Sequence, residues 1–495
     1  MAIPLIVYSL VLTVAFSLGY VTPVLAKGLL KEDERWRELE VSRSGLPFIT
    51  DKEASLLGRD QEVDLETCLR FALERQGEIR AAEQGIDAAF WKAQEAHRQG
   101  VPAVKYQYRL APVPRNVDEP LNSFFDGDIT VFNSVKLEVG APFYTFGLLS
   151  LAQSLGNLGI TEAVERKQDK MSEVAVKVYQ LYYGLLLANE INALMTRAIE
   201  ALEENIAKAE KEEYVDQVQV LKFKTITFEL YRQLDESTRK QELAKRTLRI
   251  QMGYSQNSTI EFKIGPLEPI NETVTDFEVY VASAQSQSSK RQLLDLGIAA
   301  KKKLYQIEKR RLAPALAWGS FFEFGNAPGT TGEEDSTSFN RPFNYKKAGV
   351  GLQLEGTFDW MSARAKIHQA EAEYYKTLLQ KDLALDGIEL ELRDAYLDAK
   401  QKRALMERSQ EAQHISRQIV FLTKSNLDIG IGDRKDYTDA LQSYLLFQGR
   451  YYEAVYNYNI GLIKLKQLSG ILDEEIHNLL TKGKSMPGTQ AADKR

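Results

Sequence analysis

Cysteine, histidine and proline are all scarce in this sequence of 495 residues. The one cysteine, Cys68, excludes a disulfide framework and a zinc site built from clustered cysteines. We expect it to be a small core residue rather than a reactive thiol. The four histidines, His97, His368, His414 and His477, include no pair spaced i,i+4, so no metal-binding pair on a helix is expected.

The sequence also has no excess of positive charge. Its formal net charge of -6 argues against a general nucleic-acid-binding protein, which would carry a basic surplus. The mean hydropathy of -0.32 argues against a bundle of transmembrane helices. The sequence contains no P-loop, no Gly-x-Ser-x-Gly nucleophile motif and no His-Glu-x-x-His motif. The absence of these motifs is consistent with a protein that is not an enzyme and has no cofactor or metal site.

The N-terminus has the pattern of an export signal. Residues from Ile3 to Leu25 are almost wholly apolar and uncharged, and Ala26 ends a small-residue cleavage pattern. We therefore expect a signal peptide over 1–26, followed by an N-terminal extension over 27–61. A retained anchor helix is the alternative, because the apolar run is long enough to span a bilayer.

The few prolines are gathered in short regions and leave long stretches free. Proline is absent from residues 143–265 and again from 343–486. Because proline interrupts helix interiors, both stretches are free to form long helices. A helix over about 150–212 would be roughly 95 Å long, which predicts coiled-coil packing. Apolar residues recur at spacings of three and four at Val174, Val178, Leu181, Leu185, Ala188, Ile191, Met195, Ile199, Leu202 and Ile206, and then at Leu385, Ile388, Leu392, Ala395 and Ala399.

The regions between these stretches show the pattern of β-strands. We expect strands at residues 104–110, 130–139, 316–324 and 348–354. Apolar side chains alternate with polar ones or glycine in the first and last of these, whereas Asn133 interrupts the apolar side of the second. Such alternation suits a half-buried sheet, or a barrel strand with lipid on one side and water on the other. The connections 111–129 and 326–344 are polar and are expected to be exposed loops.

The two halves of the sequence match each other. Residues 135–143 parallel residues 350–358, which predicts an internal duplication. Each half is expected to contain a helix, a strand, a loop, a strand, a very long helix, a turn and a helix. The predicted parts are a first repeat over 62–253, a linker over 254–276, a second repeat over 277–470 and a polar C-terminal tail over 471–495. Four strands are too few to close a barrel, so a membrane sheet of this kind would have to oligomerise.

The sequence resembles the TolC family of outer-membrane efflux and secretion channels over residues 62–470. Val63–Arg80 is similar to the opening helix of the family, and Glu138–Gly147 to the junction between strand and helix after the first hairpin. Gly430-Ile-Gly432, followed by Asp436–Leu441, is similar to the turn at the periplasmic end of the second half. Each motif is weak alone, but their order together with the duplication is specific.

The resemblance implies a mixed α and β membrane protein that acts as a homotrimer. Each chain would give four strands to a shared 12-stranded outer-membrane β-barrel, continuous with a periplasmic barrel of long coiled-coil helices. It would be a passive exit duct of a tripartite efflux pump or type I secretion system of a Gram-negative bacterium. Its partners would be outer-membrane lipid, a periplasmic adaptor (membrane fusion) protein, and an inner-membrane pump or ABC exporter. The alternative from the helices alone is a periplasmic coiled-coil scaffold or adaptor without a barrel.

The candidate functional residues lie mainly at the turn of the second half. Asp436 and Asp439 are spaced i,i+3 on one face of a helix. In three chains they would form a ring of carboxylates at a closed aperture, or they would be ordinary solvated acids near a helix N-terminus. Arg434 and Tyr437 would make latch contacts with a neighbouring helix pair, or would face solvent.

The remaining candidates lie at the other turn and on the strands. The first-repeat turn contains Asp216 and Gln219 but no glycine, so we expect any gate to differ between the halves. Both turns are candidates for adaptor docking. Six aromatic residues are candidates for the membrane interface, with packing inside a soluble sheet as the alternative. They are Tyr106, Tyr108, Trp318, Phe322, Phe324 and Trp360.

Overall fold

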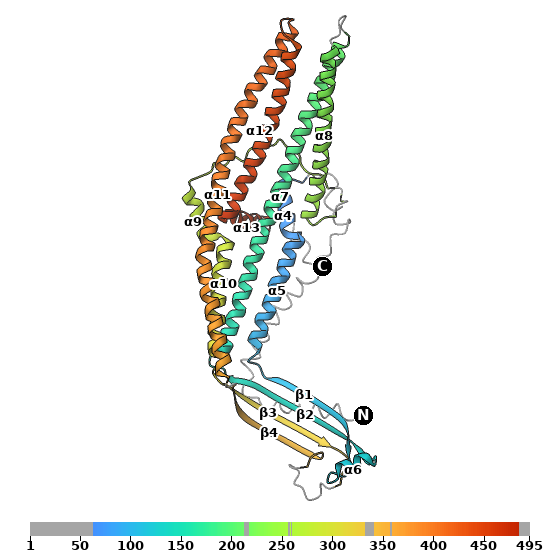
Figure 1. Ribbon diagram of the computed structural model, residues 1–495, viewed down its shortest axis with the longest axis vertical. Coiled ribbons are helices and arrows are strands. Elements are labelled where there is room, and N and C mark those ends of the chain that lie inside the picture. Colours follow the sequence, from blue (N-terminus) through green and yellow to red (C-terminus); the bar gives the residue numbers. More distant parts are fainter. Residues whose placement is uncertain are drawn as a thin grey trace.

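The molecule is long and narrow, with a β-sheet at one end and helices along the rest of its length (Figure 1). The computed structural model describes residues 63–211, 217–255, 258, 260–331, 341–356 and 359–484. The predicted signal peptide and N-terminal extension lie outside these residues. The elements are α4 (Leu65–Arg75), α5 (Gly77–Arg98), β1 (Ala103–Pro114), α6 (Pro120–Phe125), β2 (Ile129–Tyr144), α7 (Leu148–Ala209), α8 (Gln217–Gln251), α9 (Phe277–Gln287), α10 (Ser289–Arg310), β3 (Ala315–Asn326), β4 (Tyr345–Glu355), α11 (Trp360–Asp428), α12 (Arg434–Ser469) and α13 (Ile471–Lys484).

The two very long helices predicted from the absence of proline are present. α7 has 62 residues and α11 has 69, and each starts next to the sheet and runs to the far end of the molecule. α8 returns along α7 and α12 returns along α11, so each half ends in a helical hairpin (Figure 1). Closer to the sheet, α5 packs on α7, and α10 packs on both α7 and α11.

The four predicted strands form one antiparallel sheet in the order β1-β2-β3-β4. β1 and β4 are therefore the two edge strands. β1 extends to Pro114 and the short helix α6 follows it, so the predicted loop over 111–129 is shorter than expected. The reason is that Pro112 and Pro114 lie on an edge strand, where the missing N–H groups interrupt no internal ladder.

The two halves of the chain contain matching elements. α4 and α9 each have 11 residues, α5 and α10 each have 22, and β1 and β3 each have 12. The sequence predicts a polar C-terminal tail after residue 470. Instead, this segment begins with the helix α13. Leu472 and Ile476 are spaced i,i+4 and are buried, which explains why this segment packs as a helix.

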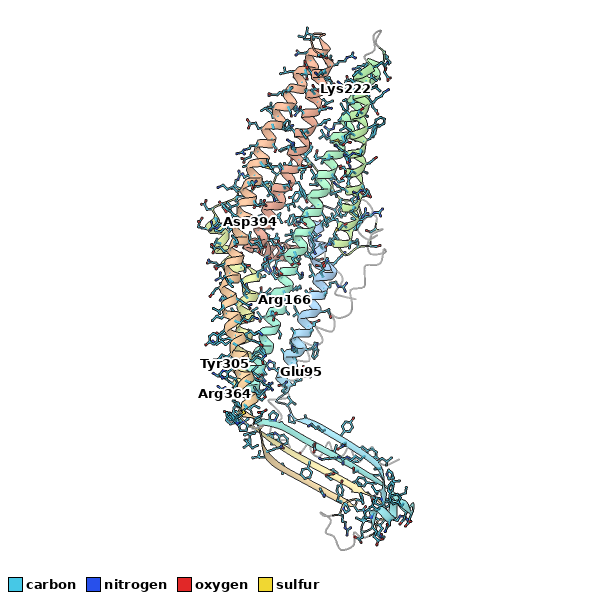
Figure 2. All side chains as sticks on the ribbon, viewed as in Figure 1. Glu95, Arg166, Lys222, Tyr305, Arg364 and Asp394 are labelled. Atoms are coloured by element: carbon cyan, nitrogen blue, oxygen red, sulfur yellow. The ribbon has the colours of Figure 1, made fainter. Side chains whose placement is uncertain are left out.

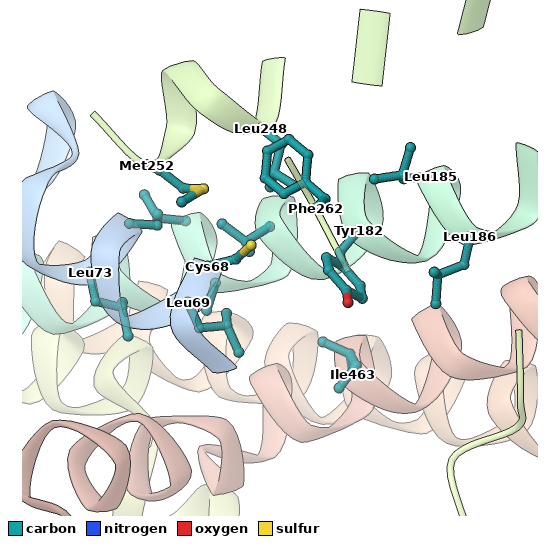
Figure 3. Packing of buried hydrophobic residues seen from close by; sticks show 14 of the residues in the cluster. Cys68, Leu69, Leu73, Tyr182, Leu185, Leu186, Leu248, Met252, Phe262 and Ile463 are labelled. Carbon is teal, nitrogen blue, oxygen red and sulfur yellow. The ribbon is translucent and has the colours of Figure 1, made fainter. Parts of the chain in front are cut away.

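The main core lies halfway along the molecule, where α4, α7, α8, α12 and α13 meet. Cys68 of α4 is fully buried there near Tyr182 of α7 and Ile463 of α12 (Figure 3). This burial confirms the prediction that Cys68 is a core residue, and it raises the pKa of the thiol to about 12. The Tyr182 hydroxyl donates a 2.7 Å hydrogen bond to the carbonyl of Lys263, which ties the segment after α8 to this core.

Candidate functional site

The turn between α11 and α12 is built by two glycines and an acidic cap. Gly430 has φ of 80°, a conformation that glycine adopts without steric cost. A side chain at Gly432 would meet the backbone nitrogen of Leu427 at 2.7 Å, so the chain can turn this tightly only with glycine there. Asp433 then caps α12, because its Oδ1 accepts a 2.9 Å hydrogen bond from the backbone N–H of Lys435.

The four candidate residues of this turn differ in their surroundings. Asp436 and Asp439 are both exposed, on the first two turns of α12. Tyr437 is only 6% exposed and belongs to an apolar cluster that includes Leu194 of α7 and Phe223 of α8. Its ring is therefore buried between the two helical hairpins rather than solvated. Arg434 is half-buried, and its carbonyl accepts a 2.8 Å hydrogen bond from Thr438 Oγ1.

The corresponding turn of the first half cannot be compared in the same detail. Asp216 lies outside the described residues. The backbone of Gln219 is part of α8, but its side chain also lies outside the described part of the chain. Both therefore stay candidates from the sequence.

The sheet has one apolar face, and this face is exposed in the single chain. The register aligns Tyr106 with Leu137 and Leu137 with Phe322, so the three side chains share one face. Tyr106 is 83% exposed, and Val350 of the edge strand β4 is 82% exposed. Other exposed apolar side chains on this face are Val104, Tyr108, Leu110, Leu352 and Leu354. A contiguous apolar surface of this kind marks contact with a membrane or with another protein.

The opposite face of the sheet carries most of its charged side chains, although Phe132 and Phe321 also lie on this face. Its side chains include Lys105, Gln107, Arg109, Lys136, Glu138, Glu323 and Lys347. Lys136 and Glu138 form a 2.6 Å ion pair along β2, and Tyr345 donates a 2.8 Å hydrogen bond to Glu323. The sheet thus has the two different faces that the alternation in the sequence predicts.

Five of the six aromatic candidates lie on the apolar face, and the sixth follows the sheet. Trp318 aligns with Leu352 near the helical end of the sheet, whereas Phe324 lies near the loops. They are six positions apart along the strand, which is about 20 Å. Tyr108 and Phe324 both align with Val135 of β2, so they lie at the same height in the sheet. Tyr106 and Phe322 lie between the two ends. Trp360 is the first residue of α11 and is exposed.

Sequence reasoning missed further aromatic residues at the helical end of the sheet. Phe143 and Tyr144 are exposed at the end of β2, and the ring of Tyr144 lies 4.7 Å from that of Phe146. The run Phe143-Tyr144-Thr145-Phe146 was visible in the sequence as an aromatic cluster next to the predicted helix start. Its density of aromatic residues is the signal that identifies it.

The described ranges were also searched for metal sites and apolar helices. No group of three or more His, Cys, Asp or Glu residues in these ranges is placed to hold a metal ion. Among the helices of the same ranges, none combines the length and the apolar character needed to cross a bilayer.

Comparison with solved structures identifies the fold. The CmeC outer-membrane channel of Campylobacter jejuni matches with a TM-score of 0.69 and 15% identity, over 84% of this chain and 89% of that one. The outer-membrane protein VceC of Vibrio cholerae matches with a TM-score of 0.67 and 14% identity, over 82% of this chain and 96% of that one. The open state of the MtrE outer-membrane channel of Neisseria gonorrhoeae matches with a TM-score of 0.68 and 13% identity, over 82% and 88%.

These matches show that the chain has the fold of outer-membrane channels, with long helices joined to four strands. The fold class predicted from the sequence is therefore confirmed for the single chain. No protein-family model and no curated protein sequence matches the chain. Because the sequence identities are this low, the matches establish the fold of the chain alone.

Proposed function

We propose that this chain is a member of the TolC family and forms the passive outer-membrane exit duct of a tripartite efflux pump or type I secretion system. The observation that carries the proposal is the sheet, with its exposed apolar face, its polar opposite face and its two unpaired edges. This sheet continues directly into helices of more than 60 residues. The solved structures of similar fold are channels rather than enzymes, which supports a duct without catalysis.

Three copies of the chain close the barrel in this proposal. β1 and β4 have 12 and 11 residues, and long edge strands of this kind require a pairing partner. If β4 of one copy pairs with β1 of the next, the homotrimer has one closed 12-stranded barrel. The apolar face then contacts outer-membrane lipid, with Tyr106, Trp318 and the other aromatic residues at this surface. The polar face lines a water-filled lumen.

The helical hairpins extend the duct through the periplasm. The ends of α7 and α11 and the starts of α8 and α12 lie farthest from the sheet (Figure 1), where the adaptor protein and the inner-membrane pump or ABC exporter would dock. Asp436 and Asp439 are exposed at this end, so three copies would bring six carboxylates around the aperture. Tyr437, and Arg434 beside it, would hold the second hairpin against the first.

Membrane fractionation together with conductance tests this proposal. The full-length protein should be recovered with the outer membrane, migrate as a trimer after cross-linking, and conduct ions when purified and added to a planar bilayer. Recovery as a periplasmic monomer without conductance would reject the duct. That result would instead support the scaffold or adaptor without a membrane barrel.

A further inference from the structure

A basic pocket lies where the helices meet the sheet. We call it the junction pocket. It has a volume of about 470 Å³ and is lined by Gly147, Ser150, Leu151, Lys302, Tyr305, Gln306, Lys309, Arg310 and Tyr374. Three of these nine residues are cations and none is acidic. The volume is within the range of sites for small molecules, and the charge favours an anion.

Neighbouring contacts hold the basic side of the pocket in place. Arg310 ends α10, and its Nη1 donates a 3.2 Å hydrogen bond to the carbonyl of Phe146, just before α7. Lys309 Nζ lies 4.7 Å from the centre of the Tyr305 ring. Lys302 and Lys309 are both exposed, so their ammonium groups are accessible to a ligand from solution or from a membrane surface.

The other wall of the pocket is aromatic. The rings of Tyr305 and Tyr374 are parallel to within 4°, with their centres 6.5 Å apart. The Tyr305 hydroxyl donates a 2.8 Å hydrogen bond to Glu371, and that carboxylate also lies 3.2 Å from His368. The Glu371 carboxylate therefore links α10 and α11 beside this wall, close enough to act on the charge of Lys309. The pocket itself offers three cations beside an amphipathic tyrosine surface.

The position of the pocket indicates the source of its ligand. Figure 2 shows Tyr305 at the end of the helical region that adjoins the sheet. α10 ends at Arg310 and β3 begins at Ala315, while β2 ends at Tyr144 and α7 begins at Leu148. The chain therefore changes from helix to strand in the first segment and from strand to helix in the second, both beside the pocket. If the apolar face of the sheet contacts lipid, this level coincides with the headgroups of the periplasmic leaflet.

We infer that the junction pocket binds the phosphate group of an anionic phospholipid headgroup. Lysine and arginine at a membrane surface attract anionic lipids, and tyrosine is favoured at the same depth because one end of its ring is polar. Leu151 provides an apolar contact where the acyl chains of such a lipid begin. This inference rests on the proposed placement of the sheet in the outer membrane.

The test uses two double variants with the same change of charge. Lys302→Gln with Lys309→Gln removes two cations from the pocket. The matched control, Lys303→Gln with Arg311→Gln, removes two cations from the end of the same segment, and neither residue lines the pocket. Binding of dioctanoyl phosphatidylglycerol, dioctanoyl phosphatidylcholine and inorganic phosphate is measured by native mass spectrometry of the full-length protein in a non-ionic detergent.

We expect wild type and control to bind phosphatidylglycerol more tightly than phosphatidylcholine, and the pocket variant to bind it roughly thirtyfold more weakly. Equal binding of the two lipids, or equal weakening in both double variants, would overturn the inference. Inorganic phosphate bound as tightly as phosphatidylglycerol would overturn the lipid as the source of the phosphate. Because binding is measured in detergent, failure of the proposed duct shows separately, as a lack of conductance.

Discussion

Two glycines at equivalent places in the two halves hold neighbouring backbones in close contact. Gly253 follows α8 and Gly470 follows α12, with φ of 78° and 79°. A side chain at Gly253 would lie 2.9 Å from Cβ of Arg75, the last residue of α4. A side chain at Gly470 would lie 2.9 Å from the carbonyl carbon of Gln287, the last residue of α9. Each glycine therefore allows a returning helix to end against the first helix of its own half.

Replacement of either glycine by alanine is expected to destabilise the protein. A left-handed backbone costs a residue with a side chain about 1–2 kcal/mol, and the close contact adds to this. Thermal unfolding followed by circular dichroism should show a lower midpoint for Gly470→Ala. Gly449→Ala is the control, because Gly449 lies inside α12 with no atom within 4 Å of an added side chain. An unchanged midpoint for Gly470→Ala would contradict this account.

A partly buried carboxyl group makes stability depend on pH. Asp473 of α13 accepts hydrogen bonds from Ser172 of α7 and Ser289 of α10. Burial, together with the nearby carboxylates of Asp169 and Glu165, raises the pKa of Asp473 to about 6, although its two serine hydrogen bonds act in the opposite direction. Burial also raises the pKa values of these two neighbours. Because the folded state favours the protonated form, stability is greatest below the unfolded pKa of 3.8 and falls as pH rises through about 6.

We expect Asp473→Asn to abolish most of this dependence. The group is partly exposed, so its ionisation should cost about 1–2 kcal/mol. Between pH 4.5 and pH 7.5, the midpoint of chemical unfolding should therefore fall more for the wild type than for the variant. Asp382→Asn on the exposed face of α11 is the control and should behave as the wild type does. If the unfolding midpoints of Asp473→Asn and the wild type change equally with pH, a group other than Asp473 controls the pH dependence of stability.

At the scale of elements, the two faces of β4 should respond differently to the same new charge. Val350 is exposed on the apolar face in the middle of the strand, and Gln353 lies on the polar face. Arginine facing lipid at the middle of a membrane costs about 2–4 kcal/mol, whereas arginine in a wet lumen costs little. Val350→Arg should therefore reduce the amount of trimer recovered from the outer membrane, and Gln353→Arg should not. Equal recovery of the two variants would mean that the apolar face of β4 does not contact lipid.

Local pattern predicted the elements well because each follows from a short-range physical rule. The helices α7 and α11 were predictable from the absence of proline and from apolar residues spaced by three and four. The strands were predictable from alternation, although the boundaries of β1 were not, since proline is tolerated on an edge strand. α13 was missed although Leu472, Ile476, Leu479 and Leu480 recur at helical spacing, because the polar composition of the segment that follows outweighed this short pattern.

At the scale of the whole molecule, the proposed aperture lies at the far ends of the hairpins. If Asp436 and Asp439 surround the aperture, replacing both by alanine should weaken the block of conductance by divalent cations about tenfold, or about 1.4 kcal/mol. Planar-bilayer recordings with increasing cation concentration measure this. Asp382→Ala with Asp386→Ala removes the same charge from α11, far from the turn, and should leave the block unchanged. A block that survives in the Asp436 and Asp439 variant would reject the carboxylate ring.

The sequence by itself determined the lengths of the helices, the alternation of the strands and the order of elements in the two halves. These depend on residues close together in the chain, through proline placement and the periodicities of helix and strand. Only the tertiary structure decided that Tyr437 is buried between two hairpins, that Gly470 closes against Gln287, and that Lys302 and Lys309 line a pocket beside the start of α7. Each of these joins residues far apart in the sequence, and their proximity arises only when the long helices pack.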